Sequence, residues 1–259
     1  MPLPKLYHWE PNANSGKPML TLMEKGVAFD SHYLDLLNFD QHKPEYLAVN
    51  PAGTIPAMTH DGKVFTESTA IMEYVDRAFD GPKLTPDDPA ERWRMRWWMK
   101  HMDQYLAPSF SMIGWSVFIG PSVRDRDPEE LKAAIARIPA PERQLAWRKA
   151  IYNLFSEEEM TESRRRVALG VVQLEEALTL RPWLAGETYS LADINGFNLA
   201  YALPLSQPHI CDDEKTPRIL AWLRAIYARP AAKATWALGR TDMAARVGYL
   251  ARPAGGPNA

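Results

Sequence analysis

A β-hairpin, the first recognisable unit of the fold, is predicted by the stretch Ile55-Pro56-Ala57-Met58-Thr59-His60-Asp61-Gly62-Lys63-Val64-Phe65-Thr66. Its central Asp-Gly pair favours the positive φ angles of a two-residue hairpin turn. Residues 55–59 and 63–66 are therefore expected to form two antiparallel strands, and a proline is tolerated where the first strand begins. Apolar residues at helical spacing follow over 70–79, so the hairpin is expected to lead into a helix.

Upstream of this hairpin, the chain alternates between strand and helix signals. Residues 5–9 suit a short strand, a turn follows, and residues 17–25 suit a helix that tolerates Pro18 in its first turn. Residues 30–34 suit a second strand. Residues 1–80 are therefore expected to form a mixed α/β domain that opens with a βαβ unit.

Downstream of the hairpin, strand signals almost vanish after a linker at 81–89, which contains three prolines and a glycine. Residues 90–252 are expected to form an all-helical domain whose first helix ends at Pro108. A charged, proline-interrupted stretch at about 121–160 is expected to be an insertion of short helices. Residues 253–259 are expected to be a flexible tail.

The composition is that of an ordinary globular protein, with 46% hydrophobic and 24% charged residues among 259 and a formal net charge of -2. This balance implies no strong field for nucleic acid or an anionic membrane. Cys211 is the only cysteine, which excludes a disulfide within the chain and a zinc site built on cysteines. No secretory signal and no run of about 18 apolar residues is present. We therefore expect a cytoplasmic protein without a metal site.

The turn that contains Asn12, Asn14 and Ser15 is the first of three candidate sites, because it lies where a strand leads into a helix. A helix start offers unpaired N–H groups and the positive end of the helix dipole, and these lower the pKa of a thiol placed there. Hydroxyl and amide donors add to this stabilisation. The same residue types also serve as ordinary helix caps, and the turn alone does not decide between the two interpretations.

The other two candidate sites flank the predicted hairpin. A cis bond before Pro56 would turn the backbone of Ile55 toward an incoming peptide, which could pair with it as an added strand does. Glu67 and Ser68, at the start of the next helix, would hold a carboxylate on helix N–H groups and an amino group on the Glu67 side chain. A tight turn and simple capping are the structural alternatives. Together the three sites match the groups of the thiol peptide glutathione.

Residues 5–79 resemble the N-terminal domain of the glutathione transferase superfamily, through Asn50-Pro51-x-Gly53-x-Ile55-Pro56 and Glu67-Ser68-x-x-Ile71. Ser190-Leu191-Ala192-Asp193-Ile194 is similar to a helix start in that family's second domain, and it also fits a capping box with Asp in place of Glu. Within the superfamily the chain most resembles the bacterial lignin β-etherases, through Ala13-Asn14-Ser15-x-Lys17-Pro18 and Thr66-Glu67-Ser68-Thr69 after the hairpin.

The resemblance implies a thioredoxin-like N-terminal domain that binds glutathione as a co-substrate, an all-α C-terminal domain and a homodimer. It implies that Asn12, Asn14 and Ser15 stabilise the glutathione thiolate. Thr54 departs from many relatives, which carry a lysine there for a carboxylate contact. The residues implied to contact glutathione are Gln41 and His42 at its glycyl end, with Thr54, Ile55, Pro56, Glu67 and Ser68.

The function implied by the resemblance is cleavage of β-aryl ethers of lignin-derived aromatics, in which the glutathione thiolate displaces a phenol at the β-carbon. The alternatives are a transferase or dehalogenase acting on another aromatic or halogenated electrophile, and a non-catalytic glutathione-binding protein. The aromatic substrate is expected in an apolar pocket between the domains, although most aromatic residues fill cores whatever the function. Its candidate contacts are Tyr7, Trp9, Met112, Trp115, Phe118, Trp147 and Tyr152.

Overall fold

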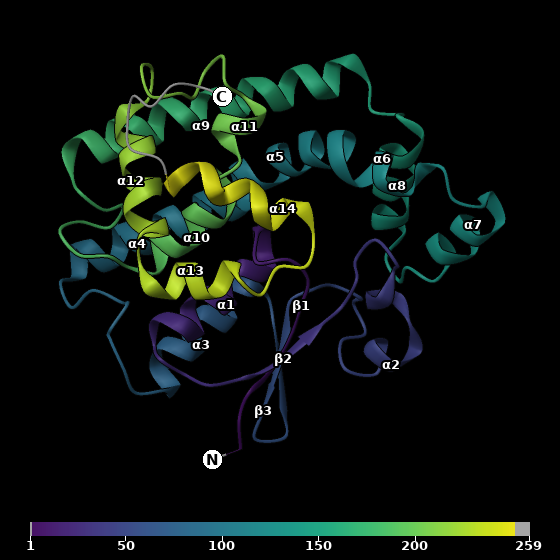
Figure 1. The fold of residues 1–259 in the computed structure, drawn as a ribbon, viewed down its shortest axis with the longest axis horizontal. Coiled ribbons are helices and arrows are strands. Elements are labelled where there is room, and N and C mark those ends of the chain that lie inside the picture. The colour runs from purple at the N-terminus through teal and green to yellow at the C-terminus, as the bar shows by residue number, and fades with distance from the viewer. Residues whose placement is uncertain (1, 252–259) are drawn as a thin grey trace.

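The computed structural model describes residues 2–251, in which a small sheet domain packs against a larger group of helices (Figure 1). The sheet has four strands in the order β2-β1-β3-β4. β1 (Lys5–His8) runs parallel to β2 (Asp30–Tyr33) and antiparallel to β3 (Ala57–His60), which forms a hairpin with β4 (Lys63–Thr66). The predicted order of a mixed α/β domain followed by an all-helical domain is confirmed.

The hairpin turn has the geometry that its Asp-Gly pair predicts, with φ of 48° at Asp61 and 72° at Gly62. β3 begins at Ala57, two residues later than the predicted strand. Pro56 has no N–H to donate to a neighbouring strand, so the ladder starts only after it.

One face of the sheet is covered by α1 (Ala13–Glu24) and α3 (Ser68–Ala78), which pack on the buried Leu6 and Met58. The helix α1 begins at Ala13 rather than at the predicted residue 17, which places Pro18 inside the helix. A proline there gives up one backbone hydrogen bond. The helix persists because its residues from 15 to 22 are all buried, and such packing supplies most helical stability in proteins.

The opposite face of the sheet is covered by less regular structure, the 3-10 turn η1 (Asp40–His42) and the short helix α2 (Pro44–Leu47). The ring of Tyr7, on β1, lies 5.6 Å from that of Tyr46, on α2. Because side chains alternate along a strand, Leu6 and Tyr7 face opposite layers. Tyr7 is therefore a residue of this second layer.

The predicted first helix of the second domain does not end at Pro108. α4 (Pro89–His101) continues through the π-helical turn η2 (Met102–Leu106) into α5 (Ala107–Gly114), and Pro108 lies in the first turn of α5. The N–H that follows η2 reaches back five residues, to the carbonyl of Met102. This wider turn relieves the clash that a proline ring makes with the preceding turn of an α-helix. The prediction was wrong because it considered the proline alone.

The same arrangement recurs further along the helix. A second π-helical turn, η3 (Trp115–Ile119), precedes α6 (Gly120–Arg124), in which Pro121 is the second residue. The resulting continuous helix, Pro89–Arg124, is long and apolar enough to cross a membrane by length and composition. The core helices of soluble proteins also pass that test, so the finding is weak support for a membrane span.

Two short helices, α7 (Pro128–Ala136) and α8 (Pro141–Tyr152), fold back beside α6 at one end of the molecule, on the right in Figure 1. They occupy the stretch that was expected to be an insertion of short helices. Their apolar side chains form a small core with residues of the first domain, in which the rings of Phe39 and Trp147 lie 4.4 Å apart. We call residues 120–152 the lobe.

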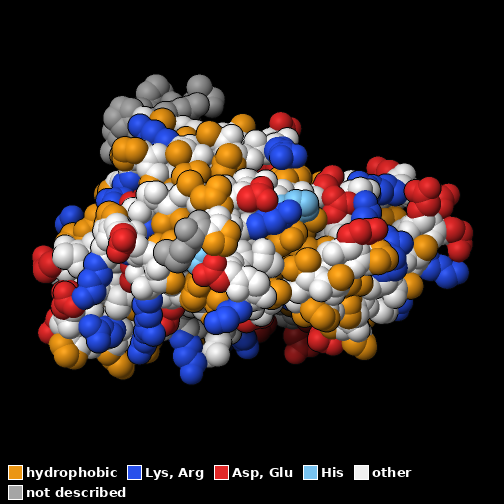
Figure 2. Space-filling view, turned by 90° about the horizontal axis from the view of Figure 1, so that it is seen from below, with side chains coloured by type: hydrophobic (Ala, Val, Ile, Leu, Met, Phe, Trp, Pro, Cys, Tyr) orange, Lys and Arg blue, Asp and Glu red, His pale blue; other side chains and the backbone are white. Residues whose placement is uncertain are grey.

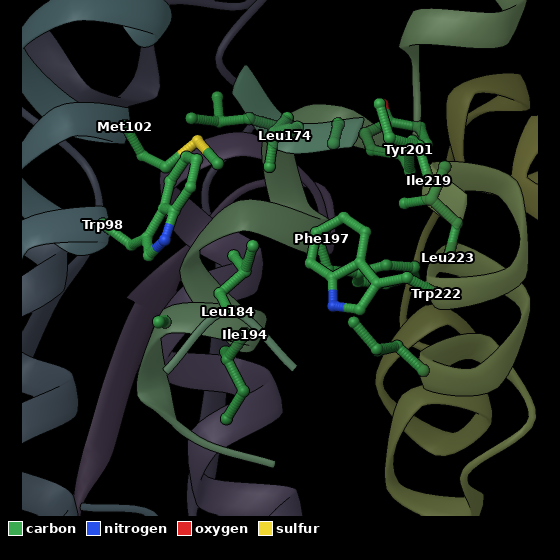
Figure 3. Close-up of a cluster of buried hydrophobic side chains, with 14 of the residues drawn as sticks. Trp98, Met102, Leu174, Leu184, Ile194, Phe197, Tyr201, Ile219, Trp222 and Leu223 are labelled. Carbon is green, nitrogen blue, oxygen red and sulfur yellow. The ribbon is translucent and has the colours of Figure 1, made fainter. Parts of the chain in front are cut away.

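The remaining helices complete the second domain. All ten residues of α10 are buried, so this helix lies at the centre of the largest core. Figure 3 shows Ile194 and Phe197 of α10 among the side chains of neighbouring helices, with Trp98, Leu174 and Trp222 in the same cluster. The expected flexible tail at 253–259 lies outside the described residues. The helices are α9 (Glu157–Leu180), α10 (Leu191–Ala200), α11 (Leu203–Ser206), α12 (Pro217–Tyr227), α13 (Pro230–Trp236) and α14 (Asp242–Ala245), followed by the 3-10 segment η4 (Arg246–Ala251).

Polar contacts join the two domains in addition to apolar packing. The Nζ atom of Lys17, on α1, lies 2.6 Å from Oδ1 of Asp103, in η2. At the other end of α1, Arg229 pairs with Glu24 at 2.6 Å. The outer surface, by contrast, is a mixture of acidic, basic and hydrophobic side chains, as Figure 2 shows for one face.

Candidate functional site

A cleft of about 410 Å³ lies between the two domains. Its volume is within the range of small-molecule sites. The first domain contributes the start of α1, η1 and the loop before β3, and the second contributes α5, η3, α8 and Phe155, two residues before α9. The lining residues are Trp9, Asn12, Ala13, Asn14, Ser15, Leu36, Gln41, His42, Gly53, Thr54, Ile55, Pro108, Ser111, Met112, Trp115, Ile119, Arg143, Ala146, Trp147 and Phe155.

The start of α1 presents hydrogen-bond donors to this cleft. The N–H of Trp9 donates to the hydroxyl oxygen of Ser15 at 3.0 Å, which leaves the Ser15 O–H to donate elsewhere. Asn14 is exposed at the same helix start. The first N–H groups of a helix have no partner within it, and the dipole adds positive potential. An anion, including a thiolate, is therefore stabilised at this point of the cleft.

Asn12 and Gly16 fix the start of α1 against the helical domain. The Asn12 side chain donates to the hydroxyl of Tyr201 at 2.9 Å. A Cβ at Gly16 would lie 1.9 Å from Oδ1 of Asn198 and 2.6 Å from the carbonyl of Pro11. Only glycine allows so close an approach to α10. Asn12 thus lines the cleft, but its side-chain amide is engaged across the domain boundary.

The loop before β3 is held by its own hydrogen bonds. The Ile55–Pro56 bond is cis, as the sequence suggested. The side chain of Asn50 donates to the carbonyl of Thr54 at 2.7 Å and to its hydroxyl at 3.0 Å, and the Tyr46 hydroxyl donates to the same carbonyl. Thr54 and Ile55 line the cleft in a fixed conformation.

Pro56, Glu67 and Ser68 do not line the cleft itself. Ala57 pairs with Thr66 in the hairpin, so Pro56 and Glu67 flank its open end side by side, next to the cleft-lining Ile55. Glu67 has φ of 65°, and Ser68 is buried at the start of α3. A non-glycine residue in this region of φ is uncommon and often marks a functional site.

Gln41 and His42 carry buried polar atoms that face the cleft. The two residues are only 3% and 2% exposed, and within residues 2–251 the Gln41 Oε1 and His42 Nδ1 atoms have no hydrogen-bond partner. Buried polar groups are nearly always paired, because an unpaired one costs about 1–3 kcal/mol. These atoms are therefore candidates for contact with a bound polar ligand.

Burial lowers the pKa of His42 to about 4, with the charges of Arg143 and Arg137 acting in the same direction. Because this pKa lies below the ordinary 6.5, the unfolded chain binds the proton more readily, and stability falls as pH decreases from 6.5 toward 4. One such group contributes a slope of at most about 1.4 kcal/mol per pH unit to the free energy of unfolding.

His42→Gln is expected to reduce the slope of the unfolding free energy against pH, measured by urea titration between pH 6.5 and pH 4. His209→Gln, at an exposed histidine, is the control, and equal slopes in both variants would contradict the prediction.

The second domain supplies an aromatic wall. Met112, Trp115 and Trp147 line the cleft opposite α1, and the rings of Trp115 and Trp147 lie 4.8 Å apart at 67°. Trp9 closes the cleft from the first domain and is 7% exposed. Flat rings in a half-open cleft suit an aromatic ligand.

Three of the expected substrate contacts are not among the residues that line this cleft. Tyr7 lies between His32 and Tyr46 on the second layer of the sheet. The ring of Phe118 lies beneath the guanidinium of Arg246 at 4.5 Å. Tyr152, the last residue of α8, is 49% exposed. The structure therefore separates them from Trp9 and the aromatic wall.

The sequence reasoning did not anticipate several lining residues, and among those that the structure describes Arg143 is the only charged one. Its sequence signal is faint: Arg143 and Trp147 are four residues apart and share one face of α8. Ser111, Ile119 and Phe155 were also missed, because nothing local distinguishes them from core or surface positions. Among residues 2–251, no group of three or more His, Cys, Asp and Glu side chains is arranged to hold a metal ion.

The sequence matches two family models, described as Glutathione S-transferase, N-terminal domain, over residues 13–78 and Glutathione S-transferase, C-terminal domain, over residues 106–230. Protein LigF of Sphingobium sp. (strain NBRC 103272 / SYK-6) is 43% identical over 235 residues, which are 88% of this chain and 91% of that protein. Glutathione S-transferase F10 of Arabidopsis thaliana is 30% identical over 227 residues, which are 85% of this chain and 91% of that protein.

Solved structures agree with the sequence matches. The crystal structure of beta-etherase LigF from Sphingobium sp. strain SYK-6 is similar with a TM-score of 0.87 at 41% identity, covering 91% of this chain and 99% of that one. Glutathione transferase F7 from Populus trichocarpa gives a TM-score of 0.70 at 24% identity, covering 90% and 97%. The second likeness concerns the fold alone.

Proposed function

Because the chain belongs to the glutathione S-transferase family, we propose that it uses glutathione to cleave β-aryl ethers of lignin-derived aromatics. One observation carries this proposal: the start of α1 and the aromatic wall open into the same cleft. The first suits a thiolate and the second a flat aromatic ring. The similarity to LigF, a protein whose crystal structure is described as that of a β-etherase, supports an aryl ether among the possible electrophiles.

The proposed reaction is a displacement at the β-carbon of an aryl ether that carries a neighbouring carbonyl. The sulfur of the thiolate forms a bond to this carbon while the carbon–oxygen bond breaks. The phenolate leaves with the electron pair and is protonated to a phenol, and a glutathione thioether remains. The protein contributes a lowered thiol pKa at the start of α1 and the orientation of both reactants in one cleft.

The first domain has a suitable partner for each group of glutathione. The start of α1 faces the thiol, and the backbone of Ile55 is available to the peptide. Gln41 and His42 offer buried polar atoms at the glycyl end. Glu67 suits the amino group of the γ-glutamyl end, since it flanks the open end of the hairpin together with Pro56, the residue that follows Ile55. The residues present therefore fit glutathione as the co-substrate.

The proposal includes a soluble cytoplasmic enzyme that works as a homodimer. Trp93 and Trp97, on α4, are 64% and 41% exposed. Large apolar side chains that gather on one exposed helix face often mark an interaction surface. The mass of the particle in solution, measured by light scattering, tests the dimer.

Incubation with glutathione and a racemic β-aryl ether ketone tests the proposed reaction. We expect equal amounts of free phenol and glutathione thioether by mass spectrometry, and chiral chromatography identifies the enantiomer that reacts. Phenol release without consumption of glutathione would count against the mechanism. Turnover of a halogenated electrophile but not of the ether would select the dehalogenase alternative.

Ser15→Ala is expected to lower kcat/KM about tenfold and to raise the pKa of the bound thiol by about one unit, because one hydrogen bond to a charged sulfur is lost. The thiolate absorbance of the protein–glutathione complex, followed against pH, measures this pKa. Ser111→Ala is the matched control, because Ser111 lines the opposite wall of the same cleft. An unchanged thiol pKa in Ser15→Ala would move the role to Asn14.

A further inference from the structure

The lobe brings a positive charge to one end of the cleft. Arg143 lies in the first turn of α8 and lines the cleft together with Gln41, His42 and Gly53 of the first domain. It is the only Lys, Arg, Asp or Glu among the described residues that line the cleft. Within residues 2–251 its guanidinium takes part in none of the ion pairs or side-chain hydrogen bonds. Its five donors are therefore available to a ligand.

The lobe that carries Arg143 is fixed to the first domain. Arg126 donates to the carbonyl of Leu37 at 2.8 Å, and the rings of Phe39 and Trp147 pack at 4.4 Å. A Cβ at Gly53 would lie 3.2 Å from Cδ of Pro139, which stands between α7 and α8. The lobe thus touches the first domain both just before η1 and at the loop before β3, and Arg143 is held over this end of the cleft.

The polar side chains of the first domain around Arg143 bring no positive charge of their own. His42 stays neutral at physiological pH, since its pKa is about 4. Its ring then carries one N–H and one acceptor nitrogen, and it hydrogen-bonds to the backbone of Gly53. Gln41 adds an amide whose orientation the structure leaves free, because its Oε1 has no partner within residues 2–251. Thr54 brings no charge, and its hydroxyl accepts from the Asn50 side chain. The charge of Arg137 also acts on His42, but among the described residues Arg143 is the one cation that lines the cleft. An arginine binds a carboxylate through two parallel hydrogen bonds.

We propose that Arg143 binds the glycyl carboxylate of glutathione, so that the helical domain supplies the charged partner for a ligand held by the sheet domain. The inference rests on the proposed function. It assigns the lobe a part in binding the co-substrate, in addition to its contribution of Trp147 to the aromatic wall. Glutathione would then be held from both domains at once.

Calorimetric titration with glutathione and with its glycinamide analogue, which lacks this carboxylate, tests the proposal. We expect the unmodified protein to bind glutathione about tenfold more tightly than the amide, as one charge-assisted contact implies. Arg143→Gln is expected to lose about tenfold in affinity for glutathione and nothing for the amide. Arg143→Lys should retain part of the preference. Arg148→Gln, on the same helix but outside the cleft lining, is the matched control and should behave as the parent.

The four affinities, for two ligands and for the parent and Arg143→Gln, form a double-mutant cycle. The cycle separates the contact between Arg143 and the carboxylate from any general effect of the substitution on the protein. Equal losses for glutathione and the amide would overturn the inference, because they would indicate a structural role. Unchanged glutathione affinity with a raised KM for the aryl ether would also overturn it and assign Arg143 to the second substrate. Absence of glutathione binding by the unmodified protein would instead refute the proposed function, and the inference with it.

Discussion

Replacing Asp193 by alanine is expected to lower the free energy of unfolding by about 4 kcal/mol or more, because four donors lose their acceptor at once. The carboxylate is fully buried at the start of α10. Its Oδ2 accepts from the N–H and the hydroxyl of Ser190 at 2.9 and 3.0 Å, and its Oδ1 accepts from the N–H of Leu184 and the indole of Trp222, both at 2.9 Å. Water cannot reach these donors in the centre of the core, so each retains its desolvation cost.

Urea unfolding measures this effect, and the chain offers a matched control. Asp127 caps α7 and accepts from the N–H groups of Glu129 and Glu130, both at 3.0 Å, at an exposed position. Asp127→Ala should therefore cost only about 1 kcal/mol, as surface caps do. If Asp193→Ala does not fold, Asp193→Asn keeps one acceptor oxygen and is expected to cost about 2 kcal/mol. Similar losses at residues 127 and 193 would contradict the argument.

Part of this site was predictable from the sequence because it is local. Ser190 and Asp193 are three residues apart, and that spacing alone indicates a capping box. The Asp61-Gly62 turn and the opening βαβ unit were predictable for the same reason, since the residues that determine each are neighbours in the chain. The contacts of Asp193 with Leu184 and Trp222 were not, because they depend on how α12 and the segment between α9 and α10 pack against the start of α10.

The cleft could be predicted only in part, because its shape depends on residues that are far apart in the sequence. Tyr7 and Trp9 would share one face if β1 continued, but the strand ends at His8 and the chain then turns Trp9 toward the cleft. The helix through Pro108 depends on a π-helical turn that no residue pattern announced. Arg143 and His42 are about a hundred residues apart in the sequence. They line the same cleft because the lobe packs against the first domain.

Asp103→Leu is expected to destabilise the protein by about 3–5 kcal/mol, because it leaves the ammonium of Lys17 buried without a counter-charge. The Lys17 side chain is completely buried, and its Nζ lies 2.6 Å from the Asp103 carboxylate. Burial lowers the pKa of Lys17, and Asp103 opposes this shift. The hydroxyl of Thr69 also donates to Asp103, as does the Asn195 amide at 3.2 Å. The carboxylate thus joins α1, α3 and α10 at one point.

Replacing the other partner of the pair, Lys17, should lower the free energy of unfolding by less. Asp103 is 31% exposed in its side chain, so after Lys17→Met it remains hydrated, and a loss of only about 1–2 kcal/mol is expected. The double variant Lys17→Met with Asp103→Leu should unfold within about 1 kcal/mol of the parent, since replacing both partners of a buried pair by apolar groups is often neutral. Urea unfolding of the four proteins measures the coupling. Equal losses in the two single variants, or additive losses in the double, would contradict it.

The double variant also separates stability from binding. Thr69 is adjacent to Ser68, at the start of α3, and its hydroxyl would lose the Asp103 acceptor in this variant. If the network only stabilises the fold, glutathione affinity should return together with the free energy of unfolding. If it also positions the start of α3 for the γ-glutamyl end, stability should return while affinity stays about tenfold lower, the equivalent of one hydrogen bond to a charged group. We expect the second result, because the hydroxyl of Thr69 keeps only its hydrogen bond from the Asn195 amide at 3.2 Å, and a restored core does not replace the lost bond to Asp103.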